Sequence, residues 1–180
     1  MMEFGAMQPR RIGNDALRSG LPARDAPEQE RTMIDANEAK KVLAAASMFG
    51  GLQETAIASI AKLAETRNYE EGDAIYTLGD PALAVYVVVS GRVRFSIGVG
   101  NRASTAHSVM QSGETFGWAA LTGKDPRRVA TASCLEDTTL LAINGDALTK
   151  YFETDTASGY AVMRQIADRI SRDLLAALST

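Results

Sequence analysis

Cysteine and histidine are almost absent from this chain, which has one of each, Cys134 and His107, among 180 residues. A single cysteine cannot form an internal disulfide. Cys134 lies in a strand-like run, so we expect it to pack as a small apolar residue in a reducing compartment. Structural zinc sites and most catalytic transition-metal sites need clustered cysteine and histidine ligands. The sequence therefore predicts no metal site, no cofactor and no catalytic triad.

A strong net charge and a long apolar segment are also lacking. The net charge is −3, which is unfavourable for general binding to nucleic acid. No run approaches the roughly 20 apolar residues that span a bilayer, and the N-terminus has no apolar signal-peptide core. No pair of acidic residues stands out as catalytic. We expect a cytoplasmic protein that is not an enzyme, spans no membrane and does not bind DNA directly.

The pattern that is present changes along the chain. Residues 1–34 hold three of the five prolines and show no hydrophobic periodicity, which predicts a flexible tail. Residues 35–180 are predicted to form a single domain, with a barrel at about 67–143 and C-terminal helices at about 146–178. This length is sufficient for one domain with a proper hydrophobic core.

Two helices are predicted ahead of the barrel. From Asp35 to Thr66 apolar residues recur at helical spacing, with Asn37 as the expected N-cap. The two glycines of Met48–Leu52 are expected to break this pattern. The second helix is then predicted to run from Gln53 to Thr66.

Between Arg67 and Ile143 the pattern changes to short strands separated by turn signals. The predicted strands are Ala74–Tyr76, Val85–Val89, Val93–Ile97, Thr105–Met110, a segment at Phe116, Val129–Cys134 and Thr138–Ile143, with a hairpin turn at Gly98–Asn101. Seven or eight short strands at this spacing are typical of a sandwich, a barrel or a jelly roll.

Two more helices are predicted after the barrel. The first is short, Asp146–Glu153, and is capped by Asn144 or Asp146, whereas the second runs from about Thr156 to Leu178. Apolar residues follow each other in the long helix at spacings of three and four: Met163, Ile166, Ile170, Leu174 and Ala177. Such a narrow stripe either packs on the barrel or pairs with another helix, so a homodimer through this helix is one of two open interpretations.

The segment Gly113–Thr131, which reads GETFGWAALTGKDPRRVAT, carries the strongest indication of a binding site. A strand-like end is followed by a short apolar helix, a loop, two arginines and another strand. Backbone N–H groups that open a short helix can bind one phosphate together with a following arginine. The segment therefore predicts a site for a small anionic ligand.

Further motifs occur in a fixed order around this segment. They are Met48–Leu52, Glu71–Tyr76, Gly79–Ala82, Tyr86–Val93, Gly113–Gly117 and Arg127–Thr131. In this order the chain resembles the cyclic nucleotide-binding domain of bacterial catabolite activators, kinase regulatory subunits and nucleotide-gated channels. The resemblance covers about Val42 to Leu178. It implies a mainly β fold with flanking helices, in which a double-stranded β-helix (jelly-roll) barrel has N-terminal helices and a long C-terminal helix.

The resemblance also implies the residues of a binding site. Family members hold a cyclic phosphate with an arginine and with amides of the short helix, and they hold the ribose 2′-hydroxyl with a glutamate. The matching ligand-binding residues of this chain are Phe116, Gly117, Trp118, Ala119, Ala120, Arg128 and Val129. Arg128 is then the phosphate-binding residue and Arg127 an exposed neighbour, unless a shifted register exchanges them. The implied ligand is cAMP or cGMP.

Trp118 departs from the family pattern, because it stands where the family has the glutamate. Loss of a charged acceptor for the ribose costs roughly 1.5–3 kcal/mol, or about one to two decades of affinity. Three interpretations stay open. Trp118 fills the pocket of a relative that binds no ligand, it lines a pocket for another anionic or planar ligand, or cyclic nucleotides bind weakly through Arg128. Arg128 itself either binds an anion or has a structural role.

Two functions follow from these observations. The first is a non-catalytic regulatory module that binds a cyclic nucleotide or another small anion and relays binding through the C-terminal helix. The second is a degenerate domain that serves as a protein-interaction or dimerisation module. A complete transcription factor is disfavoured, because no helix-turn-helix follows the C-terminal helix; a fragment of one, or a module that acts on a separate output protein, stays open. A metal-dependent enzyme on a similar barrel is disfavoured by the single histidine.

Overall fold

The computed structural model describes residues 33–96 and 109–178, all of which belong to the compact unit Arg31–Thr180. The predicted tail, apart from its last two residues, lies outside the described residues. The hairpin turn predicted at Gly98–Asn101 and the residue His107 also lie outside them. The flexible tail and the hairpin turn therefore remain predictions.

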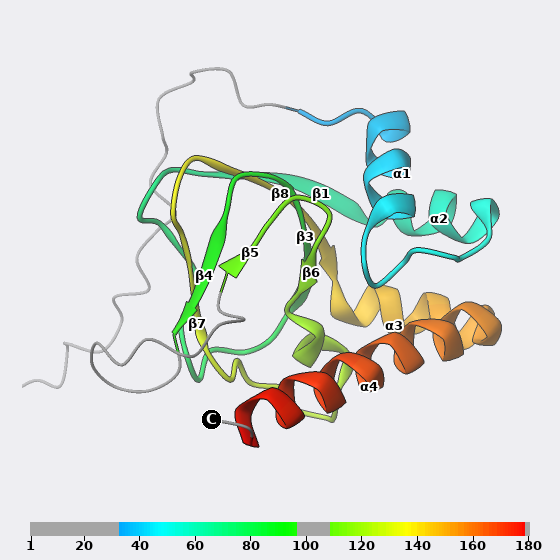
Figure 1. Ribbon diagram of the computed structural model, residues 1–180. Coiled ribbons are helices and arrows are strands. Elements are labelled where there is room, and N and C mark those ends of the chain that lie inside the picture. The colour runs from blue at the N-terminus through cyan, green and yellow to red at the C-terminus, as the bar shows by residue number, and fades with distance from the viewer. Residues whose placement is uncertain (1–32, 97–108, 179–180) are drawn as a thin grey trace, which may run out of the picture. The chain divides into compact units, whose positions relative to one another are not determined.

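Two four-stranded antiparallel sheets form the barrel in the described part of the chain (Figure 1). The first sheet has the order β1-β8-β3-β6, with β1 at Ala64–Tyr69, β8 at Thr138–Asn144, β3 at Ala84–Ser90 and β6 at Thr115–Phe116. The second has the order β2-β7-β4-β5, with β2 at Ala74–Tyr76, β7 at Thr131–Cys134, β4 at Val93–Ser96 and β5 at Val109–Met110. Neighbouring strands that are distant in sequence are typical of a jelly roll. The predicted fold class is confirmed.

Alternation of side chains along the central strands separates two hydrophobic cores. In β3, Val85 belongs to the core between the first sheet and the helices, whereas Tyr86 belongs to the core between the two sheets. In β8, Leu141 belongs to the core between the first sheet and the helices, and Leu140 belongs to the core between the two sheets. The central strands β3 and β8 are therefore buried on both faces, which explains why β3 is a continuous apolar run.

The first helix, α1, runs from Ala36 to Ala45, and its N-cap is Asp35, two residues before the predicted cap Asn37. The carboxylate of Asp35 accepts hydrogen bonds from the N–H groups of Asn37, at 2.7 Å, and Glu38, at 2.8 Å. The prediction of Asn37 as N-cap was wrong, because its own N–H is among the donors that need an acceptor. The bonds from Glu38 and Asn37 hold the pKa of Asp35 below its ordinary value.

The second helix is shorter than predicted. α2 runs from Glu54 to Ala61, and the residues from Ala64 onward form β1 instead of continuing to Thr66 as helix. β1 pairs along its whole length with β8, from Ala64 opposite Ile143 to Tyr69 opposite Thr138. The partner strand is far away in the sequence, so helical periodicity in this segment was overridden by a pairing that local patterns do not reveal.

Three helical elements come after β6 in the chain (Figure 1). η1 is a short 3₁₀ helix at Trp118–Leu121, α3 runs from Gly145 to Thr154, and α4 runs from Thr156 to Leu178. The side chain of Asn144 accepts from the N–H of Ala147 at 3.0 Å, so Asn144 is the N-cap of α3. Figure 1 shows α3 and α4 on the side of the first sheet where α1 and α2 lie, away from β4 and β7.

The predicted apolar stripe of α4 is only partly buried. Ile166 is 4% exposed and lies in the core between the helices and the first sheet. Met163 and Ile170 are each 39% exposed and Leu174 is 58% exposed, whereas the side chain of Ala177 lies outside the described part. One side of α4 thus completes the core and an adjoining apolar strip faces solvent. Among the described helices, none combines the length and apolar character that crossing a bilayer requires.

Candidate functional site

The predicted binding segment forms a tight turn after β6. Gly117 has φ 80° and ψ 16°, a left-handed conformation, and η1 starts at the next residue. A Cβ at this position would lie 2.9 Å from Nη1 of Arg128 and 3.0 Å from the carbonyl oxygen of Ala84. Glycine is needed here both for the backbone conformation and for the close approach of the arginine.

Arg128 lies inside the barrel behind this turn and is 4% exposed. Its Nη1 donates to the carbonyl oxygen of Gly117 at 3.1 Å, and its Nη2 donates to that of Ala84 at 2.8 Å. The guanidinium carbon lies 4.1 Å from the ring centre of Tyr76 and 5.5 Å from that of Tyr86. The two carbonyl oxygens and the two aromatic rings therefore stabilise the positive charge of the guanidinium.

The two adjacent arginines have different environments. The N–H of Arg128 donates to the carbonyl oxygen of Asp80 at 2.9 Å, and its own carbonyl oxygen accepts from Gly79 at 2.9 Å. These bonds direct the Arg128 side chain into the barrel. Arg127 instead forms an exposed ion pair with Asp125, with 3.0 Å between Nη2 and Oδ2. Arg128 is thus the arginine that can meet a ligand inside the barrel.

In the described part of the chain, the charge of Arg128 has no partner of opposite sign. Among the described residues no carboxylate forms an ion pair with it, and its Nε has no hydrogen-bond partner. The hydroxyl of Tyr76 does not provide a negative charge, because burial raises the pKa of that phenol. A buried charge that is only partly compensated is unfavourable. The site is therefore electrostatically suited to an anion.

A cavity of about 440 Å³ opens beside Arg128. It is bordered by residues of β1, β2, β3 and β8 and by the turn that contains Asp80 and Pro81. Its polar lining includes Glu65, Arg67 and Asn144. A volume of this size is typical of sites for small organic ligands.

The seven ligand-binding residues predicted from the sequence do not all line the same cavity. Phe116 stacks on Tyr86 inside the barrel, with 5.1 Å between ring centres. Ala119 and Ala120 are buried in the core between the helices and the first sheet, and Trp118 packs against the same core. The side chain of Val129 is 62% exposed. Of the seven predicted residues, Arg128 lines the 440 Å³ cavity and the others do not.

Trp118 does not line the cavity at Arg128. It lines a separate hollow next to α4 and is not among the residues that border the 440 Å³ cavity. The indole therefore does not fill that cavity, and it does not offer a stacking surface inside it. The short turn of η1 decides this direction, and the sequence did not predict it.

Several residues around Arg128 were missed at the level of sequence. Tyr76, Ala84 and Tyr86 contact its guanidinium through ring faces or a carbonyl oxygen. The alternation in β3 places Ala84 and Tyr86 on one face of the strand and was a usable signal. It did not identify that face as the barrel interior, because both faces of β3 are apolar.

Cysteine and acidic residues form no alternative site in the described ranges 33–96 and 109–178. No group of three or more histidine, cysteine, aspartate or glutamate residues is arranged to hold a metal ion there. Cys134 is 3% exposed, and burial raises the pKa of its thiol. The prediction that Cys134 packs as a small buried residue is confirmed.

Comparison with known proteins connects this geometry to a family. The family model described as the cyclic nucleotide-binding domain matches residues 66–155, which is half of the chain. The chain belongs to the cyclic nucleotide-binding domain family. The match extends from β1 to the end of α3 and includes the whole segment from Gly117 to Arg128, so the resemblance noted in the sequence is confirmed.

Two relatives of this cyclic nucleotide-binding domain carry the names of a regulator and an activator. The chain is 24% identical over 136 residues to a CRP-like cAMP-activated global transcriptional regulator of Mycobacterium tuberculosis, a match that covers 73% of this chain and 58% of the regulator. It is 28% identical to the catabolite activator protein of Thermus thermophilus, with a TM-score of 0.63 over 74% of this chain and 62% of that protein. The chain thus spans less than two thirds of the length of these regulators.

A third comparison supports the fold. The regulatory domain of Toxoplasma gondii PKA, solved in complex with cAMP, has a TM-score of 0.57 and 20% identity, and the match covers 64% of this chain and 43% of that chain. At this level of identity the likeness concerns the architecture. It shows that the barrel, together with its flanking helices, is the one expected from the sequence.

Proposed function

We propose that this domain is a non-catalytic, cytoplasmic regulatory module that binds a cyclic nucleotide or another small anionic ligand beside Arg128. The observation that carries the proposal is the buried guanidinium, which borders a cavity of about 440 Å³ and forms no ion pair among the described residues. An anion in this cavity supplies the missing negative charge and an acceptor for Nε. The regulatory names of the relatives favour the same conclusion.

The cavity also has groups that suit a sugar and a base. The side chains of Glu65, Asp80 and Asn144 border it and can accept hydrogen bonds from hydroxyl or amino groups. The rings of Tyr76 and Tyr86 border it as well and offer apolar surface. We propose that these residues take over the contact to the ribose that a glutamate makes in the family, since Trp118 faces α4.

Ligand binding is relayed through η1 in this proposal. Arg128 bonds the carbonyl oxygen of Gly117, directly before η1, so an anion that reorients Arg128 alters the contact that anchors this helix. Ala120 of η1 packs closely on α3, because a Cβ at Gly145 would lie only 2.6 Å from its carbonyl oxygen. Ala120 also shares a core with Ile166 of α4. Since packed elements of this kind move together, α4 is the output of the module.

Calorimetric titration of the full chain with cAMP and with cGMP tests the proposal, with Arg128→Gln and its neighbour Arg127→Gln as a matched pair. We expect saturable binding that Arg128→Gln weakens by about one to two decades, since a charge-assisted contact contributes roughly 1.5–3 kcal/mol. Arg127→Gln is expected to change the affinity by less than about fivefold, because its ion pair is exposed.

Two outcomes would count against the proposal. Absence of binding at millimolar concentrations of both nucleotides excludes the nucleotide form of the proposal. Equal affinity in Arg128→Gln and the unmodified chain removes Arg128 from the site. Circular dichroism and thermal melting of Arg128→Gln establish that the variant is folded before its affinity is interpreted.

The exposed apolar strip of α4 favours a second function, in which the helix pairs with a second copy of the chain. Met163, Ile170 and Leu174 are 39%, 39% and 58% exposed, at spacings that bring them to one side of the helix. Sedimentation equilibrium tests this function. A dimer is expected to dissociate in Leu174→Asp and to persist in the control variant Arg164→Gln, whereas a monomer at all concentrations excludes self-pairing.

A further inference from the structure

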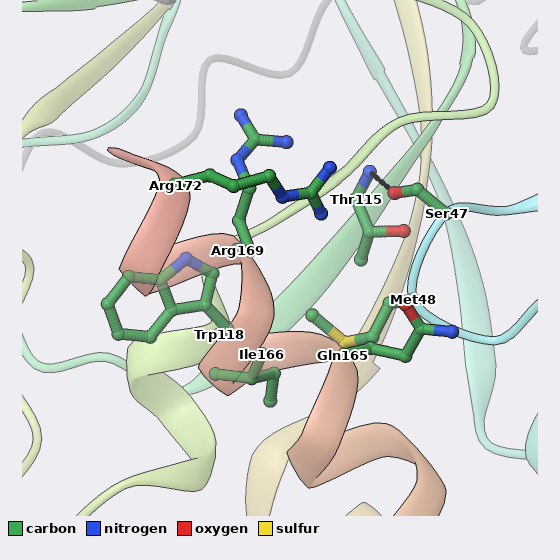
Figure 2. A pocket seen from close by; sticks show the side chains of 8 residues that line it. All are labelled: Ser47, Met48, Thr115, Trp118, Gln165, Ile166, Arg169 and Arg172. Atoms are coloured by element: carbon green, nitrogen blue, oxygen red, sulfur yellow. Dashed lines mark hydrogen bonds between the residues drawn. The ribbon is translucent and has the colours of Figure 1, made fainter. Parts of the chain in front are cut away.

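A second and smaller hollow lies between β6, η1 and α4 (Figure 2). Its volume is about 40 Å³. Thr115 of β6 and Trp118 of η1 line it from one side, and Ile166, Arg169 and Arg172 line it from α4. None of these residues borders the cavity at Arg128, so the two sites are separate.

Thr115 brings an unsatisfied polar group to this hollow. The residue is 6% exposed, and its Oγ1 has no hydrogen-bond partner among the residues that the structure describes. Its backbone N–H donates to Oγ of Ser47 at 3.2 Å, as Figure 2 shows, so the backbone of β6 is fixed while the hydroxyl is left without a partner. A buried hydroxyl in this condition is unfavourable unless a ligand or water completes it.

Two arginines of α4 reach the same hollow. The Nε of Arg169 donates to both carboxylate oxygens of Asp173, at 3.0 and 3.1 Å, and its Nη2 lies 3.9 Å from the sulfur of Met110. The Nε of Arg172 donates to the carbonyl oxygen of Asp168 at 3.3 Å. In the described part of the chain, Asp173 is the one acid that forms an ion pair with either arginine. The hollow therefore carries an excess of positive charge.

Figure 2 shows both guanidinium groups at the side of the hollow where Thr115 lies. Hydrogen-bond donors prevail there: guanidinium N–H groups that no described acceptor occupies, and a hydroxyl that can rotate toward an acceptor. The side chains of Trp118 and Ile166 contribute apolar walls, which strengthen charge interactions by excluding water. A volume of about 40 Å³ holds water-sized groups but not a nucleoside.

We propose that this hollow is a second ligand site, specific for a small oxyanion of the phosphate type. Guanidinium groups recognise such anions through paired N–H donors, and the hydroxyl of Thr115 completes the set. The anion bridges Arg169 and Arg172 of α4 to β6, directly before η1. Its binding stabilises the position in which α4 packs on the barrel, so it biases the same helix that the Arg128 site controls, without requiring a nucleotide there.

Trp118 allows this proposal to be tested directly, because it is the only tryptophan in the chain and it lines the hollow. The full chain is titrated with inorganic phosphate at constant ionic strength, with chloride as the reference anion, and the tryptophan fluorescence is recorded. We expect a saturable change with phosphate and none with chloride. The melting temperature is expected to rise with phosphate along the same binding curve.

Three variants locate the binding. Arg169→Gln and Thr115→Val are each expected to weaken the phosphate midpoint at least about tenfold, which corresponds to loss of one charge-assisted contact. Thr115→Val keeps the shape of the side chain and removes only the unsatisfied hydroxyl, so folding is expected to be retained. Arg164→Gln, on the same helix but stacked on Tyr160 at 5.8 Å, is the matched control and is expected to keep the unmodified midpoint.

The outcomes decide between a built site and general attraction to a basic helix. A fluorescence change that does not saturate, or one that chloride reproduces, overturns the proposal. So does a phosphate midpoint that is the same in the unmodified chain, Arg169→Gln and Thr115→Val. Neither variant touches the cavity at Arg128, so failure here leaves the nucleotide titrations unaffected and the two proposals are tested separately.

Discussion

Gly117 and Arg128 are in direct contact at the binding segment, and each limits what the other can be. The guanidinium occupies the space beside the glycine that a Cβ would need, 2.9 Å from its Nη1. Gly117 also has φ near 80°, which side chains other than glycine rarely adopt. The resemblance noted in the sequence predicts both residues as part of one motif, and the contact between them gives a physical reason for their occurring together.

The first prediction concerns this contact. Gly117→Ala is expected to destabilise the protein by about 2–4 kcal/mol, because left-handed strain adds to the displacement of Arg128. Gly123→Ala is the matched control: its φ is 72°, but nothing lies within 4 Å of the added Cβ. It is expected to cost about 1 kcal/mol, which is backbone strain alone. Urea unfolding measures both, and equal losses would show that the contact with Arg128 contributes nothing.

The second prediction concerns Trp118. Because its side chain lines the hollow beside α4 and not the cavity at Arg128, Trp118→Ala is expected to change affinity for cyclic nucleotides by less than about threefold, or under 1 kcal/mol. Calorimetric titration measures this change. If Trp118 instead filled the pocket, the variant would gain affinity by a decade or more. Thermal melting of the same sample reports the packing that is lost at the core of η1 and α4.

At the scale of elements, the junction of α3 and α4 depends on one side chain. Asp155 accepts from the hydroxyl of Ser158 at 2.6 Å, from the N–H of Ser158 at 3.1 Å and from the hydroxyl of Tyr151 at 2.8 Å. It therefore caps the start of α4 while it binds the last turns of α3. The two bonds from Ser158, followed by that from Tyr151, hold the pKa of Asp155 below its ordinary value.

The third prediction follows from that lowered pKa. A carboxyl group with a depressed pKa in the folded state contributes stability that is present above its unfolded pKa, near 4, and is lost as pH falls through the folded pKa. The melting temperature of the unmodified chain is therefore expected to fall more steeply than that of Asp155→Asn when the pH is lowered from 6 to about 3. Parallel curves for the two proteins would contradict this role of Asp155.

At the scale of the whole molecule, the first sheet couples two cores. Leu140 and Leu141 are neighbours in β8, yet Leu140 packs between the sheets and Leu141 packs under the helices. Both are at most 1% exposed. Since the sheet is shared, loss of either core removes support from the other.

The fourth prediction follows from this shared sheet. Leu140→Ala and Leu141→Ala are each expected to lower the free energy of unfolding by about 2–5 kcal/mol. Both variants are expected to keep one transition in which circular dichroism and the fluorescence of Trp118 coincide. Separate transitions for the two signals in Leu141→Ala would show that the helices unfold independently of the barrel.

Much of the architecture was predictable from local signals. The strands β3 and β8 are apolar runs bounded by turn residues, and the helices α3 and α4 have clear boundaries in the sequence. The prediction failed where a long-range pairing was decisive, at residues 64–66, which were predicted to end the second helix but begin β1, paired with β8. The hydrophobic period of a segment cannot by itself decide between a helix and a strand when the partner strand lies far along the chain.

For the binding site, too, the sequence predicted some features and long-range contacts decided the others. The sequence by itself determined the family, the barrel and the presence of an arginine behind a glycine turn, because these depend on residue types at fixed spacing. Only the tertiary structure decided that Arg128 forms no ion pair among residues 33–96 and 109–178, that the rings of Tyr76 and Tyr86 contact it, and that Trp118 faces α4. The physical reason is that burial, charge pairing and side-chain direction are set by residues brought together from separate strands and helices.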